Sequence, residues 1–241
     1  MLRLENICWN TPDGVGILND LNLTVPDGKL VVITGPNGGG KTTLAKIIAG
    51  LYQQDSGKIY LDDQDITSLD ITERAKLGIS FAFQQPVRFK GITVKKLLEL
   101  SAGEQISEDK MCDILSKVGL CAREYINREV NATLSGGEIK RIEIATVIAR
   151  HSKLSVFDEP EAGIDLWSFT NLIHTFEEMR RNMNGTIIII SHQERILQIA
   201  DEIAVVADGK IKSSGSTNTM MDKLLGGSEK TAKCSKQEEL F

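Results

Sequence analysis

The sequence lacks any apolar run long enough to cross a bilayer. A membrane-spanning helix needs roughly 20 consecutive, mostly apolar residues, and the longest apolar run here, GTIIIIS at Gly185–Ser191, has the length of a buried strand. The N-terminus, MLRLENICWN, carries charges among its apolar residues and lacks the apolar core of a secretion signal. We therefore expect no direct membrane insertion and a cytoplasmic protein.

Cysteine is scarce, and there is no excess of basic residues. The four cysteines, Cys8, Cys112, Cys121 and Cys234, form no C-x-x-C pair, and no histidine clusters with them. This spacing is typical of free thiols in a reducing compartment and argues against a structural metal site. The chain has 28 Lys and Arg against 33 Asp and Glu, a net charge of −5. Because phosphate-backbone binding usually leaves a basic footprint, we expect no nucleic-acid partner.

Strand and helix patterns alternate along most of the 241 residues. Two strand patterns come first, and the apolar run KLVVITG then predicts a strand buried on both faces, as in a parallel sheet. The sequence of residues 85–150 predicts several helices and no strand. We therefore expect one α/β domain over residues 1–225, with a mixed, mostly parallel sheet, antiparallel strands at the N-terminus and a helical insertion at about 85–150. The polar stretch 226–241 is predicted to be a flexible tail.

A glycine-rich stretch follows the predicted buried strand and precedes a predicted helix. GPNGGGKT fits the pattern G-x-x-x-x-G-K-[ST] in the structural context that this pattern requires. Its glycines let backbone N–H groups converge on phosphate oxygens, together with the helix N-terminus. Lysine would reach the β- and γ-phosphates, and threonine would bind Mg²⁺. The predicted nucleotide ligands are Gly35, Pro36, Asn37, Gly38, Gly39, Gly40, Lys41, Thr42 and Thr43.

Two acids end another apolar strand pattern, LSVFDEP. At the carboxyl end of a parallel strand, Asp158 and Glu159 would lie beside the glycine-rich loop. Asp158 is predicted to hold Mg²⁺, directly or through water. Glu159 is predicted to orient or deprotonate the attacking water. The alternative is a pair of solvated acids at a strand end.

A second possible phosphate binder is LSGGE, at Leu134–Glu138, directly before the helical pattern IKRIEIATVIAR. Ser135 and Glu138 fit a capping box, so the segment could be only a helix start. Two adjacent glycines, Gly136 and Gly137, nevertheless cost helix stability, and they favour a site where bare backbone approaches an anion. Two phosphate-binding elements in one chain suggest that two chains share two nucleotides.

The order of these motifs resembles that of ATP-binding cassette (ABC) ATPases. GPNGGGKTT, FQ, LSGGE, FDEP, AGID and SH follow one another as in that family, over about residues 2–225. The resemblance implies a P-loop NTPase fold, hydrolysis of ATP with Mg²⁺, and an ATP-dependent head-to-tail homodimer with each ATP between the phosphate loop of one chain and Ser135–Gly137 of the other. It also implies that Gln84 senses magnesium and the γ-phosphate, that Asp165 crosses the dimer interface, and that His192 contacts the γ-phosphate.

Trp9 has two possible roles. ABC ATPases usually stack adenine on an aromatic residue near the N-terminus, and Trp9 is the candidate here. It could equally pack within a sheet. Gly39 stands where the family often has serine, and the resemblance implies that glycine is tolerated because the backbone does the binding.

Three shorter stretches are similar to the ATPase of SUF iron–sulfur cluster assembly. They are FQQPVRFKG, REVNATLSGGEIKR and SHQERIL, matched through residues such as Pro86, Arg128 and Arg195. This resemblance implies a SufB/SufD-like scaffold as partner. DEPEAGID departs from the pattern of that family and is closer to ordinary transporter ATPases. The alternatives are the ATP-binding subunit of a membrane transporter and a soluble regulator, although the chain has neither a second cassette nor a coiled-coil insert. Arg88, Phe89 and Lys90 are predicted to face the partner.

Overall fold

The computed structural model describes residues 1–231, apart from residue 86 and residues 183–184. Pro86, Cys234 and the last part of the predicted tail, residues 232–241, therefore lie outside the described residues. The cysteines that are described, Cys8, Cys112 and Cys121, are free thiols.

The larger of two sheets has six strands in the order β10-β9-β3-β8-β7-β6. All neighbouring pairs are parallel except the β9–β10 hairpin. Every residue of β3, β7 and β8 is buried, as expected where both faces of a parallel sheet are covered. The strands are β3 (Leu30–Thr34), β6 (Ile79–Ala82), β7 (Leu154–Asp158), β8 (Thr186–Ile190), β9 (Glu202–Ala207) and β10 (Lys210–Ser216).

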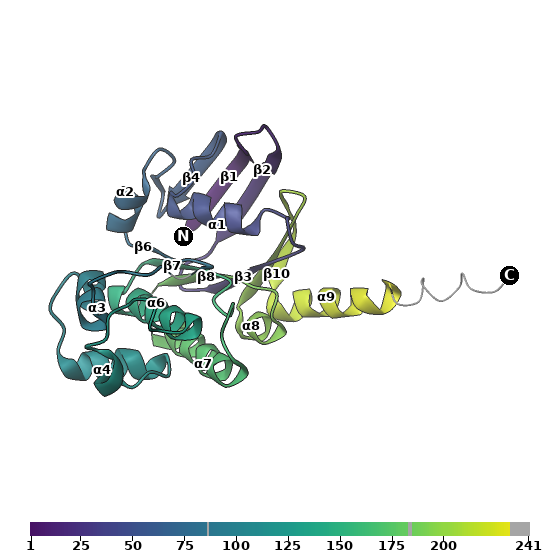
Figure 1. Ribbon diagram of the computed structural model, residues 1–241. Coiled ribbons are helices and arrows are strands. Elements are labelled where there is room, and N and C mark those ends of the chain that lie inside the picture. Colours follow the sequence, from purple (N-terminus) through teal and green to yellow (C-terminus); the bar gives the residue numbers. More distant parts are fainter. Residues whose placement is uncertain (86, 183–184, 232–241) are drawn as a thin grey trace.

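The smaller sheet is antiparallel and lies above the first in Figure 1, with the order β2-β1-β4-β5. Its strands are β1 (Leu2–Asn10), β2 (Gly16–Val25), β4 (Ser56–Leu61) and β5 (Gln64–Asp65). In β2 the residues Leu21, Leu23 and Val25 are buried and alternate with exposed ones, because only one face of this sheet meets the core. The two sheets enclose α1, and all three contribute to one apolar cluster.

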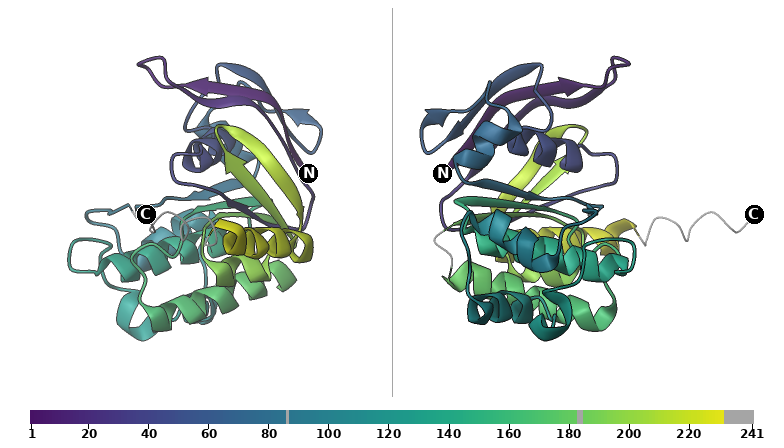
Figure 2. Two further views of the ribbon diagram at one scale, coloured as in Figure 1. Left: turned by 90° about the vertical axis from the view of Figure 1, so that its right-hand side faces the viewer. Right: turned by 60° about the vertical axis from the view of Figure 1, so that its left-hand side comes forward.

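The remaining helices, apart from α2, lie on the other face of the large sheet, where they form a second apolar cluster with it (Figure 2). Within the described residues, no helix is both long and apolar enough to span a bilayer. The helices are α1 (Lys41–Ala49), α2 (Ile71–Lys76), α3 (Val94–Ala102), α4 (Glu108–Lys117), α5 (Ala122–Tyr125), α6 (Gly136–Arg150), α7 (Leu166–Asn182), α8 (Glu194–Ile199) and α9 (Thr217–Thr231).

The predicted fold class is confirmed: a mostly parallel sheet with antiparallel N-terminal strands. The helices α3 to α6 follow β6 and precede β7 in the chain. Helix α9 continues past residue 225 to Thr231. Met220 is buried, and Met221 and Leu224 pack against the core. These apolar contacts anchor the first turns of a helix that then extends into the segment predicted to be a flexible tail.

Candidate nucleotide-binding site

The glycine-rich segment Gly35–Thr42, here called the phosphate loop, joins β3 to α1. Gly35 and Gly40 have φ of 136° and 101°, a region that L side chains rarely adopt. A Cβ at Gly35 would lie 2.0 Å from the carbonyl oxygen of Val206. The chain can therefore double back tightly beside β9. The ammonium of Lys41 donates to the carbonyl oxygens of Gly35 and Pro36, both at 2.8 Å, so it is held inside the loop.

Position 39 requires glycine for a steric reason that the sequence did not show. A Cβ there would lie 2.8 Å from the carbonyl oxygen of Val206 and 3.0 Å from that of Pro36. The N–H of Gly209 also donates to the carbonyl oxygen of Gly39 at 3.3 Å. A side chain at this position would need a shift of the β9–β10 hairpin. Glycine is therefore demanded by the close approach of β9, and not merely tolerated.

Asp158 is brought against the phosphate loop by β7. Its Oδ1 accepts a hydrogen bond from the Thr42 hydroxyl at 3.1 Å, and the residue is 1% exposed. Burial raises the pKa of Asp158, and the bond from Thr42 opposes that rise. A hydroxyl and a carboxylate side by side are the hard oxygen donors that Mg²⁺ prefers. The donor set at this point therefore fits a magnesium ion.

Glu159 is the next residue and adopts a left-handed conformation, with φ of 46°. Such backbone is uncommon for a residue with a long side chain and is concentrated at functional sites. The N–H of Glu159 donates to Ile190 at the end of β8, and its Oε2 accepts from Gln84 Nε2 at 2.6 Å. Glu159 also lines a pocket, together with Ile17, Asn37, Gly38, Gly40 and Lys41–Thr43.

His192 lies just past the end of β8, the strand beside β7. Its side chain is exposed. The preceding residue, Ser191, donates its hydroxyl to Glu161 Oε1 at 2.5 Å, which ties this strand end to the turn after Glu159. Burial raises the pKa of Glu161, whereas the bond from Ser191 and the nearby His192 lower it. The structure thus places His192, Asp158 and Glu159 at the carboxyl ends of neighbouring strands.

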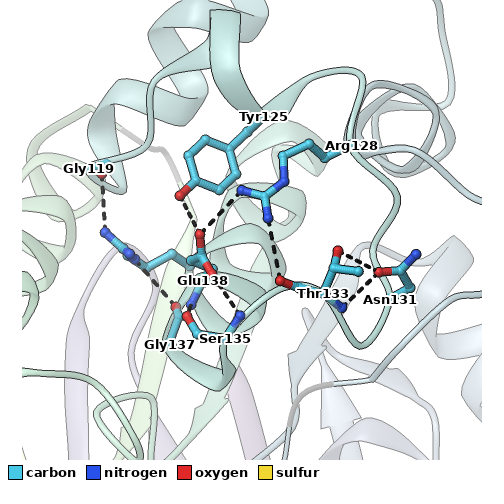
Figure 3. Close-up of polar contacts among 9 residues, drawn as sticks. Gly119, Tyr125, Arg128, Asn131, Thr133, Ser135, Gly137 and Glu138 are labelled. Atoms are coloured by element: carbon cyan, nitrogen blue, oxygen red, sulfur yellow. Dashed lines mark hydrogen bonds and ion pairs between the residues drawn. The ribbon is translucent and has the colours of Figure 1, made fainter.

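The segment Leu134–Glu138, here called the signature segment, begins α6 as Figure 3 shows. Ser135 caps the helix: its hydroxyl accepts from the N–H of Glu138 at 3.3 Å, and Glu138 Oε2 accepts from the N–H of Ser135 at 2.7 Å. The capping box is therefore present, as one interpretation of the sequence required. A Cβ at Gly136 would meet nothing within 4 Å, so the backbone there is open to an approaching group.

Tyr125 and Arg128 anchor Glu138 from the segment before α6 (Figure 3). The Tyr125 hydroxyl donates to Glu138 Oε1, and Arg128 lies 3.5 Å from the same oxygen. The hydroxyl of Tyr125, with contributions from Ser135 and Arg128, lowers the pKa of Glu138 to about 2 although burial opposes this. No motif in the sequence identified Tyr125, because it precedes Glu138 by 13 residues and meets it only through folding.

The predicted site residues fall into two groups in the structure. The first group lies at the phosphate loop, where Thr42 is hydrogen-bonded to Asp158 and Glu159 to Gln84. The second group is Ser135, Gly136 and Gly137, which do not line the pocket at the loop. Asp165 accepts a hydrogen bond from the N–H of Ser168 in the first turn of α7. The carbonyl oxygen of nearby Gly163 lies 3.3 Å from where a Cβ of Gly137 would be, so this turn lies beside the signature segment.

Trp9 packs within the small-sheet layer. Its ring is stacked on Tyr52, with centroids 5.0 Å apart and planes 2° from parallel. The N-terminal residue that lines the pocket at the phosphate loop is Ile17, which sequence reasoning missed because an aliphatic residue on a strand carries no motif. Of the two roles considered for Trp9, the structure therefore favours packing.

The site combines a phosphate loop beside the large sheet, two acids at a strand end and a second glycine-rich helix start. These features define a nucleotide-binding cassette, and comparison with known proteins agrees. The family model described as ABC transporter matches residues 18–162. The chain is 39% identical, over 207 residues, to an uncharacterized ABC transporter ATP-binding protein of Methanocaldococcus jannaschii, covering 83% of this chain and 82% of that protein. The chain therefore belongs to the ABC family and is an ABC-type ATPase.

Two further matches support this assignment. The probable ATP-dependent transporter ycf16 of Antithamnion sp. is 33% identical over 221 residues, which cover 85% of this chain and 87% of that protein. A dimeric ATP-binding cassette solved in a post-hydrolysis state with ADP and Pi superposes with a TM-score of 0.81 at 24% identity, covering 90% of this chain and 99% of the other. At that identity the likeness concerns the fold.

Proposed function

We propose that this protein is the ATP-hydrolysing subunit that drives a membrane transporter, acting as an ATP-dependent dimer on the cytoplasmic side. The single observation that carries the catalytic part is that Thr42 and Glu159 line the pocket at the phosphate loop, where Thr42 is hydrogen-bonded to Asp158 and Glu159 to Gln84. The printed names of the relatives, an ABC transporter ATP-binding protein and a probable ATP-dependent transporter, favour the transporter as the driven partner.

Within each site, the residues of the phosphate loop bind the ATP phosphates through their N–H groups. Lys41 exchanges its two carbonyl partners for phosphate oxygens, since an ammonium gains more from anionic acceptors. Thr42 and Asp158 hold Mg²⁺, which neutralises charge on the phosphates when bound. Glu159 positions the attacking water and accepts its proton. Gln84 and His192 report the presence of the γ-phosphate.

The separation of the signature segment from the pocket supports a dimer. Gly136 leaves the backbone open at the N-terminus of α6, a natural anion site, and none of Ser135, Gly136 and Gly137 lines the pocket at the phosphate loop of the same chain. A head-to-tail pair would bring each signature segment to the other chain's ATP, with Asp165 near the interface. Each composite site would then be complete only in the dimer.

The glutamine variant of Glu159 tests this mechanism. Glu159→Gln keeps the side-chain size and removes the proton acceptor, so we expect ATP binding to persist while turnover falls by roughly 10²-fold or more, as for loss of a general base. Light scattering should then show a dimer with MgATP and a single chain without nucleotide. Undiminished turnover would remove Glu159 from its role, and a single chain with ATP bound would contradict the shared sites.

The partner is proposed to bind beside Gln84. An apolar groove there is lined by Phe81, Phe83, Val87, Phe89 and residues of α3 and α6. Phe89 is half-buried: it packs against the helical core while lining this groove, and its N–H donates to Val130. Arg88 and Lys90 are exposed at this segment. We expect the groove to take an apolar segment of the transporter's membrane subunit, flanked by acidic residues.

Charge reversal at Arg88 and Lys90 should weaken partner binding and leave the ATPase activity of the isolated chain intact. Unchanged partner binding would contradict the assignment, whereas loss of both together would point to misfolding instead. A pull-down from native extract with mass spectrometry identifies the partner: a multi-spanning membrane protein supports the transporter. The SUF ATPase remains the second candidate because of the FQQPVRFKG and REVNATLSGGEIKR stretches, and recovery of a soluble SufB/SufD-like scaffold would favour it.

A further inference from the structure

The backbone of Phe83 is held by two oppositely charged side chains of α6. Its N–H donates to Glu143 Oε1 at 2.8 Å, and its carbonyl oxygen accepts from Lys140 Nζ. The two side chains also form an ion pair, with 3.3 Å between Lys140 Nζ and Glu143 Oε2. We call Lys140, Glu143 and the backbone of Phe83 the Phe83 clamp.

The clamp lies in the interior. Lys140 is 1% exposed, and burial raises the pKa of Glu143 even though Lys140 lowers it. Taking two charges out of water can cost more than their attraction returns, so a buried ion pair is a weak source of stability. Apolar residues of the same volume would fill the space equally well. The charged pair adds specific hydrogen bonds that apolar residues lack. Lys140 donates to the carbonyl oxygen of Phe83, and Glu143 accepts from the N–H of the same residue.

The clamp joins two parts of the molecule that face different nucleotides in the proposed dimer. On one side, Gln84 follows Phe83 directly and binds Glu159 in the chain's own pocket. On the other side, Lys140 lies on α6, little more than one turn from Ser135, which begins that helix. In a head-to-tail dimer the signature segment of this helix touches the nucleotide held by the partner. The intervening helical turn is stiff because its backbone hydrogen bonds are internal.

We propose that Lys140 and Glu143 are positioning residues that couple the two ATP sites of the dimer. When the signature segment engages the partner's nucleotide, α6 moves, and the clamp makes Phe83 and Gln84 move with it. The contact between Gln84 and Glu159 in one site therefore depends on occupancy of the other. This inference rests on the proposed dimeric ATPase. Such coupling is a reciprocal free energy between two sites, and it gives positive cooperativity with a Hill coefficient between about 1 and 2.

Two variants distinguish the effect of the hydrogen bonds to Phe83 from the effect of the ion pair between Lys140 and Glu143. The double variant Lys140→Met with Glu143→Leu removes both charges together, so it leaves no unpaired buried charge and nearly conserves volume. Glu143→Gln is the control that keeps both bonds to Phe83, because its amide oxygen can still accept from the N–H while Lys140 still donates to the carbonyl. Since it leaves Lys140 without its counter-ion, its rate is compared once thermal unfolding shows that it is folded. The readout is the Hill coefficient of ATPase rate against MgATP, together with the ATP affinity of the dilute single chain.

We expect the wild type and Glu143→Gln to be cooperative and the double variant to fall to a Hill coefficient of about 1, with single-chain ATP affinity changed less than about twofold. If the double variant does not fold, the charge exchange Lys140→Glu with Glu143→Lys takes its place in the test. The exchange keeps an ion pair, but it places a carboxylate at the carbonyl oxygen of Phe83 and an ammonium at its N–H. Unchanged cooperativity in the folded variant, or equal loss in Glu143→Gln, would overturn the proposal.

The dimer is tested separately, so the two failures are distinguishable. If Glu159→Gln forms no dimer with MgATP, the proposed function fails and the coupling fails with it. If the dimer forms but the wild type shows a Hill coefficient of about 1, the coupling alone is wrong.

Discussion

Replacing Tyr125 with phenylalanine removes one hydroxyl, the donor to Glu138 Oε1 shown in Figure 3. A hydrogen bond to a charged group contributes about 1.5–3 kcal/mol to stability. Glu138 keeps its bond from Ser135 and its contact with Arg128, and it is partly open to solvent, so we expect a loss below this range, about 1 kcal/mol. In a chain of this length that lowers Tm by roughly 2–4 °C.

The loss should depend on pH because the hydroxyl favours the ionised form of Glu138. The folded pKa of Glu138, about 2, lies below its ordinary value of 4.5. A group with a lowered folded pKa stabilises the protein above its unfolded pKa, and this contribution disappears as the pH falls through the folded pKa. Because Glu138 has the same unfolded pKa in both proteins, the difference in stability between wild type and Tyr125→Phe should be complete at neutral pH and shrink only as the pH approaches the folded pKa of about 2.

Urea unfolding of both proteins at several pH values measures this difference. Tyr60→Phe is the matched control, since its ring keeps the contact with the Arg3 guanidinium, 4.6 Å from the ring centroid, and we expect a change within about 0.5 kcal/mol. ATP affinity of the dilute chain should be unchanged in Tyr125→Phe, because the phosphate loop lies elsewhere. A loss of equal size at neutral pH and at about pH 2, or none at neutral pH, would refute the role given to the hydroxyl.

Three other substitutions follow from local geometry, each measured by thermal unfolding with and without MgATP. Gly35→Ala should destabilise by more than about 2 kcal/mol and abolish ATP binding, since its Cβ would overlap Val206; normal binding would contradict the loop geometry. Gly136→Ala should leave single-chain stability within about 0.5 kcal/mol but weaken the ATP-dependent dimer; an unweakened dimer would count against the signature contact. Arg74→Met should cost about 3 kcal/mol, because the buried guanidinium donates to the carbonyl oxygens of Ile47 and Ile48; a neutral result would show that water replaces it.

The parts of the site that the sequence predicted are those whose chemistry is local. The phosphate loop needs consecutive glycines, a lysine and a threonine between a strand and a helix, so a short stretch carries it. The capping box of Ser135 and Glu138 is likewise contained in four residues. The acids Asp158 and Glu159 were placed by a fold rule, that the carboxyl ends of parallel strands share one edge.

Contacts between segments remote in sequence were not predicted. Lys140 and Glu143 resemble ordinary surface charges on a helix until Phe83 is folded against them. Tyr125 reaches Glu138 across 13 residues, and the need for glycine at position 39 comes from Val206 on a distant strand. The packing of Phe89 against the helical core was likewise not visible in the sequence, which predicted only that this residue faces the partner.

The sequence by itself determined the class of chemistry and the order of the elements, because backbone conformation, hydrophobic periodicity and helix capping depend on neighbours along the chain. Only the tertiary structure decided which side chains hold Gln84 and the signature segment in place, and that Ser135 does not line the pocket at the phosphate loop. The physical reason is that burial and hydrogen-bond geometry depend on neighbours in space, and a pattern in one segment does not specify the partner that packs against it.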